Sequence, residues 1–120
     1  MLTRKDILKY VNKEYETISE KPWITFPKNE VLRHSKSKKW YGIIMEISAN
    51  KIGINSKEKI DIINLKNSPE FIDFILSSNE KIYPAYHMNK KHWITIALNG
   101  SVEDKKIYKL IDTSFNMTEN

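Results

Sequence analysis

Side-chain character alternates strictly from His92 to Leu98, and this pattern restricts the local structure more than any other stretch. A period of two is typical of a half-buried β-strand. One face of that strand would carry Ile94, Ile96 and Leu98, and the other face would carry Trp93, Thr95 and Ala97. The preceding residues are basic and aromatic and contain Pro84, so they predict a short strand at 82–83 and then a turn or irregular link.

The first half of the chain predicts one helix followed by strands. Apolar residues at helical spacing indicate a helix over 4–19, with Thr3 as N-cap and Asp6 in a capping box. The connector 20–29 has apolar side chains that we expect to close one end of the core: Trp23, Ile24 and Phe26. Residues 30–36, 39–47 and 60–65 predict strands, and the polar segment 48–59 predicts an irregular excursion.

The strand at 39–47 also alternates, which assigns its two faces. The core side is expected to carry Tyr41, Ile43, Met45 and Ile47. The outward side is expected to carry Trp40, Gly42, Ile44 and Glu46. A polar, basic turn at 35–38 then lies at the tip of a hairpin.

Two further helices are marked by their first residues. Ser68, Pro69 and Glu70 are typical of a helix start, and Ser101 is expected to cap a last helix with Asp104 in its first turn. The order of helices and strands, joined by short connections, predicts a single α+β domain over 1–120. It has two layers, a mostly antiparallel sheet with helices packed on one face, and the other sheet face is expected to be open.

Positive charge gathers in two acid-free windows. The chain has 120 residues, a net charge of +5 and a pI of about 9.3. Between Glu30 and Glu46 lie four basic residues and no acid: Arg33, Lys36, Lys38 and Lys39. Between Glu80 and Glu103 lie Lys81, Lys90 and Lys91, and all three histidines (His34, His87 and His92) fall in these windows. Such clustering favours an anionic partner if the windows meet in space, and otherwise forms a solvated basic face.

Several kinds of chemistry find no support in the sequence. Without cysteine there is no disulfide or thiol chemistry, and neither a nucleophile elbow nor a glycine-rich phosphate loop is present. His87 and His92 stand five residues apart without a neighbouring carboxylate, a spacing that we do not assign to a metal. We therefore expect a non-enzymatic protein with no catalytic residues, no metal and no cofactor. It is expected to be a monomeric cytoplasmic protein, because the composition suits a reducing compartment and no segment is apolar enough to span a membrane.

Basic and aromatic residues at strand ends indicate nucleic-acid binding. Lysine and arginine can hold phosphates, while Trp40 and Trp93 can stack or contact a partner. The expected DNA contacts are Arg33, Lys36, Lys38, Lys39, His87, Lys90, Lys91 and His92. An alternative left open is a protein-interaction or small-ligand module on the open sheet face, using Trp40 and Trp93. Packing of both tryptophans in the core is the structural alternative to either function. A third function class left open is an enzyme in which His87 or His92 pairs with Asp61, Asp112 or another acid in a cleft.

The motifs along the chain resemble those of the MmcQ/YjbR family of small bacterial proteins. They are Pro22-Trp23, Lys39-Trp40-Tyr41 leading to Ile44-Met45, Asn64-Leu65-Lys66, Ser68-Pro69-Glu70, the run Pro84 to Trp93, and the run Leu110 to Phe115. Among them, Tyr-His-Met-Asn-Lys-Lys-His-Trp, residues 86–93, is the most specific. The resemblance implies a CyaY-like fold and a DNA-binding role through two basic wings. One wing would carry Arg33, Lys36, Lys38 and Lys39, and the other would carry His87, Lys90, Lys91 and His92.

Overall fold

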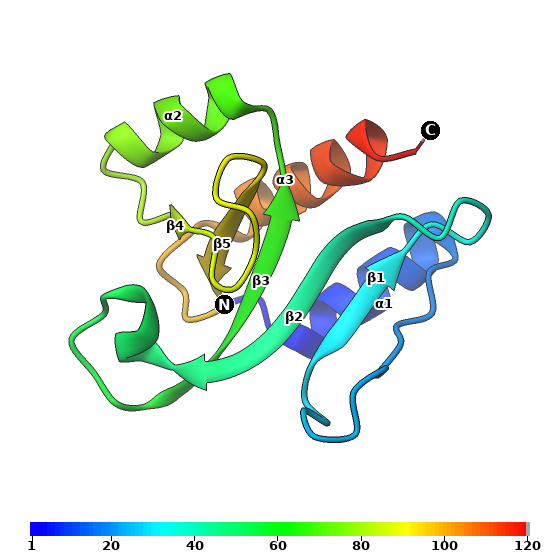
Figure 1. Cartoon of the computed structure of the whole chain (residues 1–120), viewed down its shortest axis with the longest axis horizontal. Helices are drawn as coiled ribbons and strands as arrows, with labels where there is room; N and C mark the ends of the chain where they lie inside the picture. Colours follow the sequence, from blue (N-terminus) through cyan, green and yellow to red (C-terminus); the bar gives the residue numbers. More distant parts are fainter. Residues whose placement is uncertain (120) are drawn as a thin grey trace.

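The computed structural model describes residues 1–119 as three helices and a five-stranded antiparallel sheet in the order β1-β2-β3-β5-β4 (Figure 1). The elements are α1 (Arg4–Tyr15), β1 (Glu30–Arg33), β2 (Trp40–Ser48), the 3-10 turn η1 (Ala49–Ile52), β3 (Lys59–Lys66), α2 (Pro69–Ser77), β4 (Tyr83–Pro84), β5 (Trp93–Ala97) and α3 (Asp104–Met117). The predicted α+β class is confirmed. No helix within residues 1–119 has the length and apolar character needed to cross a membrane.

Helices α1 and α3 cover one face of the sheet, and the main core lies between the two layers (Figure 1). Helix α1 contributes Ile7 and Val11, and α3 contributes Ile107, Leu110 and Ile111. From β5, Ile94 and Ile96 are fully buried in this core, and Leu98 follows them, as the alternation predicts. Burying each such side chain contributes about 1.5–3 kcal/mol, which makes this layer the main source of stability.

Helix α1 begins as expected and ends earlier. Thr3 and Asp6 form the reciprocal capping box, which confirms the predicted start. The helix ends at Tyr15 rather than at 19, because Glu16 adopts a left-handed conformation with φ 57°. The N–H of Glu16 donates to the Asn12 carbonyl and that of Thr17 donates to the Val11 carbonyl, which closes the helix with a left-handed cap.

A β-bulge near the start of β2 reverses the predicted orientation of most of the strand. Leu32 pairs with Gly42 and Arg33 pairs with Trp40, so Tyr41 is an extra residue. Tyr41 faces the helices as expected, but so does Ile44, which was expected to point outward. On the opposite face lie Ile43, Met45 and Ile47, which were expected in the core. Both faces of β2 are apolar, so alternation alone could not locate the bulge.

The predicted start is confirmed for α2 and is wrong for α3. Ser68 caps α2, its hydroxyl accepting from the Phe71 N–H at 3.2 Å, and Pro69 is the first helical residue, as predicted. The expected Ser101 cap of α3 is wrong, since Glu103 precedes the helix. The Ser101 hydroxyl donates instead to the Asn99 side chain at 2.6 Å, inside the preceding turn.

The connector 20–29 runs beside β1 and does not close the core as expected. Ile24 is 97% exposed and Phe26 is 60% exposed, and only Trp23 is half-buried. Glu20 forms a bridge with Val31 on β1, with hydrogen bonds of 3.0 and 2.8 Å in the two directions. At the other edge of the sheet, the two-residue strand β4 ends in Pro84.

Candidate functional site

The hairpin between β1 and β2 presents three lysines on a tightly closed turn. The N–H of His34 donates to the Lys39 carbonyl at 2.9 Å, and the N–H of Lys38 donates to the His34 carbonyl at 3.1 Å. Lys38 adopts a left-handed conformation, with φ 66°, at the end of the turn. The side chains of Lys36, Lys38 and Lys39 are all exposed. The turn therefore displays positive charge at the tip of the sheet.

Arg33 and His34, at the base of this turn, are engaged within the protein. The Arg33 guanidinium lies over the Trp40 ring, 5.6 Å from its centre, and Nε is 3.4 Å from a Glu20 carboxylate oxygen. The contact is an ion pair that lacks hydrogen-bond geometry. His34 is buried and its Nε2 lies 2.7 Å from the Thr118 hydroxyl, and this burial lowers the pKa of the imidazole. His34 thus belongs to the packing of the hairpin.

The second basic segment is the loop 85–92 between β4 and β5, which lies across the front of the sheet in yellow in Figure 1. Asn89 organises its tip, because its side chain accepts from the Lys91 N–H at 2.9 Å and its carbonyl accepts from the Trp93 N–H at 3.0 Å. Lys90 and Lys91 are exposed there, and His92 is half-buried.

A buried polar pair on the sheet holds the start of this loop. Asn64 on β3 donates to the Tyr86 carbonyl at 3.0 Å, and the Tyr86 N–H donates to the Thr95 hydroxyl at 2.8 Å. Asn64 and Thr95 are themselves hydrogen-bonded and fully buried. His87 follows in a left-handed conformation, φ 56°, with its exposed ring 4.0 Å from that of Tyr86. The predicted outward face of β5 is therefore covered at Thr95 by the loop.

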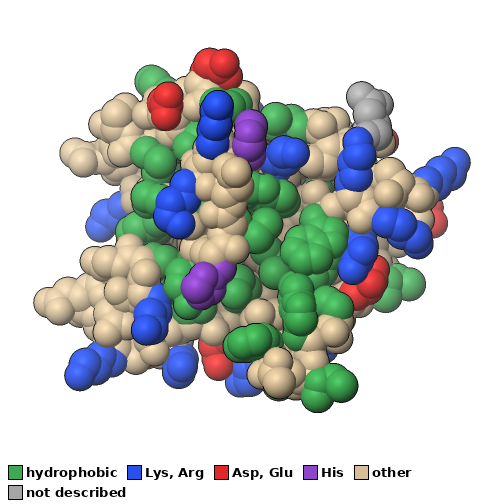
Figure 2. All heavy atoms as spheres, viewed as in Figure 1, with side chains coloured by type: hydrophobic (Ala, Val, Ile, Leu, Met, Phe, Trp, Pro, Cys, Tyr) green, Lys and Arg blue, Asp and Glu red, His purple; other side chains and the backbone are tan. Residues whose placement is uncertain are grey.

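Between the two segments lies a cavity of about 410 Å³, which we name the sheet groove. Its floor is apolar and comes from β2, with Ile43, Met45 and Ile47. One wall is formed by Trp23, Phe26 and Trp40, and the other by Tyr86, His87 and Met88; Asn29 and Glu46 complete the lining. Figure 2 shows hydrophobic side chains filling the region between the histidine-bearing loop and the lysine-rich tip of the hairpin.

The structure pairs Trp40 with Trp23 rather than with Trp93. The rings of Trp23 and Trp40 meet edge to face with centres 5.7 Å apart, and both indoles line the sheet groove. Trp93 is half-buried at the start of β5, opposite Lys66, and does not line the groove. The connector was expected to close one end of the core and instead supplies a wall of the groove. Its exposed apolar residues were a signal for this role.

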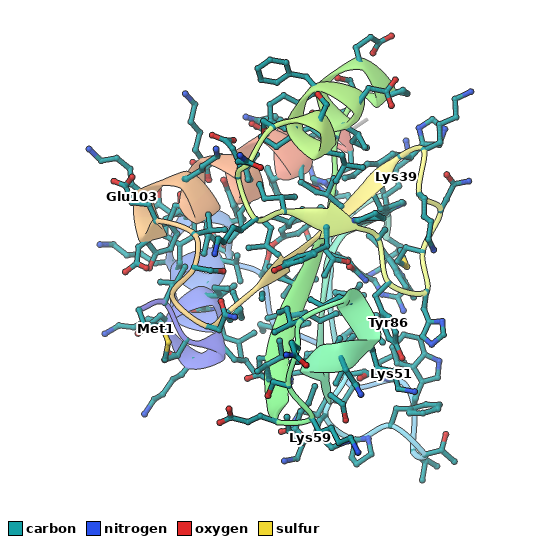
Figure 3. The ribbon with its side chains drawn as sticks, turned by 90° about the vertical axis from the view of Figure 1, so that its left-hand side faces the viewer. Met1, Lys39, Lys51, Lys59, Tyr86 and Glu103 are labelled. Atoms are coloured by element: carbon teal, nitrogen blue, oxygen red, sulfur yellow. The ribbon has the colours of Figure 1, made fainter. Side chains whose placement is uncertain are left out.

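Both basic segments face the same side of the sheet. Trp40 directly follows Lys39, and Tyr86 to Met88 directly precede the Asn89 tip, so each segment continues a groove wall. Figure 3 shows Lys39 and Tyr86 on one side of the sheet, with Met1 and Glu103 on the other. The lysines at the two tips form no ion pair with any other part of residues 1–119. They are Lys36, Lys38, Lys39, Lys90 and Lys91.

Lys51 joins this basic surface from a segment that sequence reasoning left unassigned. It lies on η1, is exposed, and lines a second hollow of about 380 Å³ together with His87 and Lys90. Figure 3 shows it beside Tyr86. The lysine-rich composition of 48–59 was the only signal for this position, and the fold was needed to place it.

A separate polar cluster lies among the aromatic residues of the helix layer. The hydroxyls of Tyr10 and Tyr15 both donate to Oδ1 of Asp112, the first at 2.7 Å. Burial and the Asp112 carboxylate raise the pKa of Tyr10 to about 12 and raise that of Tyr15 as well. Tyr15 also stacks on Phe115 with ring centres 3.8 Å apart. This cluster joins α1 to α3 and lies away from the sheet groove.

No three His, Asp or Glu side chains within residues 1–119 are grouped in a way that could hold a metal ion. Glu46 is the one carboxylate in the described lining of the sheet groove, and it is 3.3 Å from the Lys28 ammonium. The groove therefore combines an apolar, aromatic interior with cationic margins. That arrangement can hold a ligand that has a flat apolar part and negative charge beside it.

Comparison with known proteins places the chain among relatives of the same size. A family model named YjbR matches residues 13–117. The Bacillus subtilis protein YyaQ is 45% identical over 119 residues, 99% of this chain and 100% of its own length. The Escherichia coli K12 protein YjbR is 34% identical over 67 residues, which cover 56% of this chain and 57% of that protein.

Solved structures agree with the fold. A crystal structure of a Pseudomonas syringae protein, 45% identical, superposes with a TM-score of 0.93 and covers 98% of this chain and 99% of that one. A Deinococcus radiodurans protein that is 22% identical has a TM-score of 0.73 over 98% of this chain and 78% of its own, which shows a shared fold. On the family match and the full-length relative, the chain belongs to the YjbR family.

Proposed function

We propose that this protein binds DNA without catalysing a reaction, with the lysines of the two basic segments holding backbone phosphates. The observation that supports this most directly is that both segments border one groove and carry exposed, unpaired lysines. They are Lys36, Lys38 and Lys39 on the hairpin turn and Lys90 and Lys91 on the β4–β5 loop. Phosphate contacts of this kind supply affinity and position the protein on the nucleic acid.

The remaining predicted DNA contacts, Arg33, His87 and His92, have lesser roles in this proposal. Arg33 is held between Glu20 and Trp40, so it shapes the groove wall more than it reaches outward. His87 is exposed beside Tyr86 and can contact a ligand directly, while His92 is half-buried at the end of the loop. Because α1 and α3 cover the opposite face of the sheet, we expect little base reading in the major groove. We also propose a cytoplasmic monomer that needs no cofactor.

A titration of fluorescently labelled DNA at several salt concentrations tests the proposal. The test variant reverses four charges at the two tips: Lys38→Glu, Lys39→Glu, Lys90→Glu and Lys91→Glu. Its control makes the same change in total charge on exposed lysines of the helix layer: Lys5→Glu, Lys9→Glu, Lys105→Glu and Lys109→Glu. The tip variant should bind at least about tenfold more weakly and show a shallower salt dependence, since each lost phosphate contact reduces the slope by about 0.9.

Two outcomes would count against DNA binding. One is the absence of any binding by the unmodified protein at low salt. The other is equal weakening by the tip and control variants, which would reduce the interaction to net charge.

A second candidate function is a small-ligand or protein-interaction module that uses the same face. The observation in its favour is the sheet groove itself, whose volume of about 410 Å³ falls within the range of ligand pockets of about 300–1,000 Å³. This version depends on Trp40 and Trp23, because Trp93 lies outside the groove. Binding that quenches tryptophan fluorescence and is insensitive to salt and to the lysine variants would favour it over DNA binding.

A further inference from the structure

We infer that the sheet groove receives an unstacked base, so that the preferred ligand is a single-stranded nucleic acid rather than a duplex. This inference rests on the proposed function and specifies its ligand. Two features of the site carry it: the aromatic character of both groove walls, and the position of the lysines outside the groove.

The walls offer flat aromatic and heteroaromatic side chains that are held by contacts within each wall. On the hairpin side, the edge-to-face contact of Trp23 and Trp40 and the guanidinium of Arg33 over Trp40 set the orientation of these indoles. On the loop side, Tyr86 is anchored by both of its backbone groups, and His87 packs against it at 4.0 Å. Phe26 adds a side chain that is 60% exposed and covers no core. Aromatic side chains of this kind stack with bases of any sequence.

Charge is distributed so that phosphates would lie on the rims and not inside. Lys38 and Lys39 precede Trp40 on one wall, and Lys90 with Lys51 flanks His87 beside the other. No lysine or arginine is among the described residues that line the groove, and its apolar floor of Ile43, Met45 and Ile47 disfavours a buried phosphate and suits a neutral, flat group such as a base. A strand of nucleic acid meets both requirements, because each base is flat and neutral and is flanked by phosphates.

A duplex meets only one of these requirements. Its bases are stacked on one another and paired, so they enter a pocket only after unstacking, which costs a few kcal/mol in proteins that extrude bases. A duplex could contact the lysines and leave the apolar lining in water. A single strand can use the lysines and the aromatic walls together.

The test compares one labelled oligonucleotide, single-stranded and as a duplex of equal length, by fluorescence anisotropy at one low salt concentration. The unmodified protein should bind the single strand at least about fivefold more tightly, since stacking of one base supplies a difference of this size or more. Phe26→Ala should weaken single-strand binding by about fivefold and leave duplex binding unchanged. Phe74→Ala is the matched control, because Phe74 is 67% exposed on α2 and does not line the groove.

A second variant, Trp40→Ala, should abolish the preference for single strands, with its melting temperature measured to confirm folding. Equal binding of both forms, or Phe26→Ala acting no differently from Phe74→Ala, overturns the inference while lysine-dependent binding upholds the proposed function. Absence of lysine-dependent binding to either form overturns both.

Discussion

The side-chain amide of Asn64 donates a hydrogen bond to the backbone carbonyl of Tyr86 at 3.0 Å, from a position with no exposed surface. Thr95 completes the arrangement by accepting from the Tyr86 N–H and donating to Asn64. One buried pair on β3 and β5 thus satisfies both backbone groups of the residue that begins a groove wall. Buried polar groups are stable only with such partners, so this pair couples the sheet to the position of the loop.

Thr95→Val should loosen this loop. The change keeps the side-chain shape and removes the hydroxyl, which leaves the Tyr86 N–H without its acceptor. We expect the free energy of unfolding to fall by about 1–3 kcal/mol. Urea denaturation measures the loss, and hydrogen exchange of the Tyr86 amide should accelerate.

Thr113→Val is the control for that experiment. Its hydroxyl donates to the Lys109 carbonyl at 3.0 Å within α3, at the protein surface. We expect its effect on stability to stay within about 0.5 kcal/mol, the usual range for surface changes. Equal losses in the two variants would contradict a special role for the buried pair.

Arg4→Met should destabilise the fold by about 3 kcal/mol, the lower end of the loss for breaking a buried ion pair. Arg4 is mostly buried and reaches Glu30 at 3.1 Å and Asp61 at 2.8 Å, so it ties α1 to β1 and β3. Burial lowers the pKa of Arg4, but the Asp61 and Glu30 carboxylates raise it by more, so the net shift is upward. Removing the Arg4 guanidinium would leave these two carboxylates beside one another without a cation.

The comparison for Arg4 is Lys28→Met, which removes an exposed ion pair with Glu46. Exposed pairs contribute about 0–1 kcal/mol, so chemical denaturation should show a much smaller change. A loss as large as that of Arg4→Met would mean that burial is not the cause of the difference.

Stability should fall at alkaline pH because of the tyrosine cluster. The pKa of Tyr10 is raised to about 12 by burial and by Asp112, above the value of about 10 expected in the unfolded chain. A raised pKa stabilises the fold fully below pH 10, and that contribution is lost as pH rises toward 12. Denaturation at successive pH values should therefore show a decline between about pH 10 and 12.

Asp112→Asn isolates the part of that effect due to the carboxylate. Removing its charge should lower the pKa of both Tyr10 and Tyr15 toward the ordinary value, so tyrosinate absorbance should appear at lower pH in an ultraviolet titration. Asp73→Asn, an exposed change on α2, supplies the same difference in charge. Superimposable titrations of the Asp112 variant and the unmodified protein would rule the carboxylate out as a cause.

The orientation of β2 can be tested with a pair of isoleucines. Ile44 is fully buried against the helix layer, whereas Ile24 is 97% exposed in the connector. Ile44→Ala should lower the free energy of unfolding by about 2–5 kcal/mol, and Ile24→Ala should change it by less than about 0.5 kcal/mol. Thermal melting of both variants decides the point, and a loss for Ile44→Ala no larger than that for Ile24→Ala would contradict the burial of Ile44 against the helix layer.

Local patterns in the sequence predicted the parts of the fold that depend on local structure. The Thr3 and Asp6 capping box, the Ser68 cap and the burial of Ile94, Ile96 and Leu98 each follow from a few neighbouring residues, and each is confirmed. The bulge at Tyr41 depends instead on pairing with β1, which no local pattern reports. Ser101 failed as a cap because the Asn99 side chain competes for its hydroxyl.

The sequence predicted the charged residues of the candidate site but not the groove that lies between them. The lysines of both windows are exposed as expected, and they stand at the tips of the predicted turns. The groove between them needed three segments distant in sequence: the connector with Trp23, the bulged strand with Trp40, and the loop with Tyr86. Its assembly depends on tertiary contacts such as that of Asn64 with Tyr86, which the sequence alone does not specify.

The two edge strands of the sheet limit how copies of the protein can associate in a concentrated solution. At one edge, β1 is only four residues long, and Val31 already exchanges both backbone hydrogen bonds with Glu20. At the other, Pro84 has no N–H to offer a further strand. Unprotected edges allow sheets to polymerise by adding strands from other molecules, and these features oppose that route. Self-association of the folded protein, where it occurs, should therefore proceed through side chains on its faces and leave no signature of intermolecular β-structure.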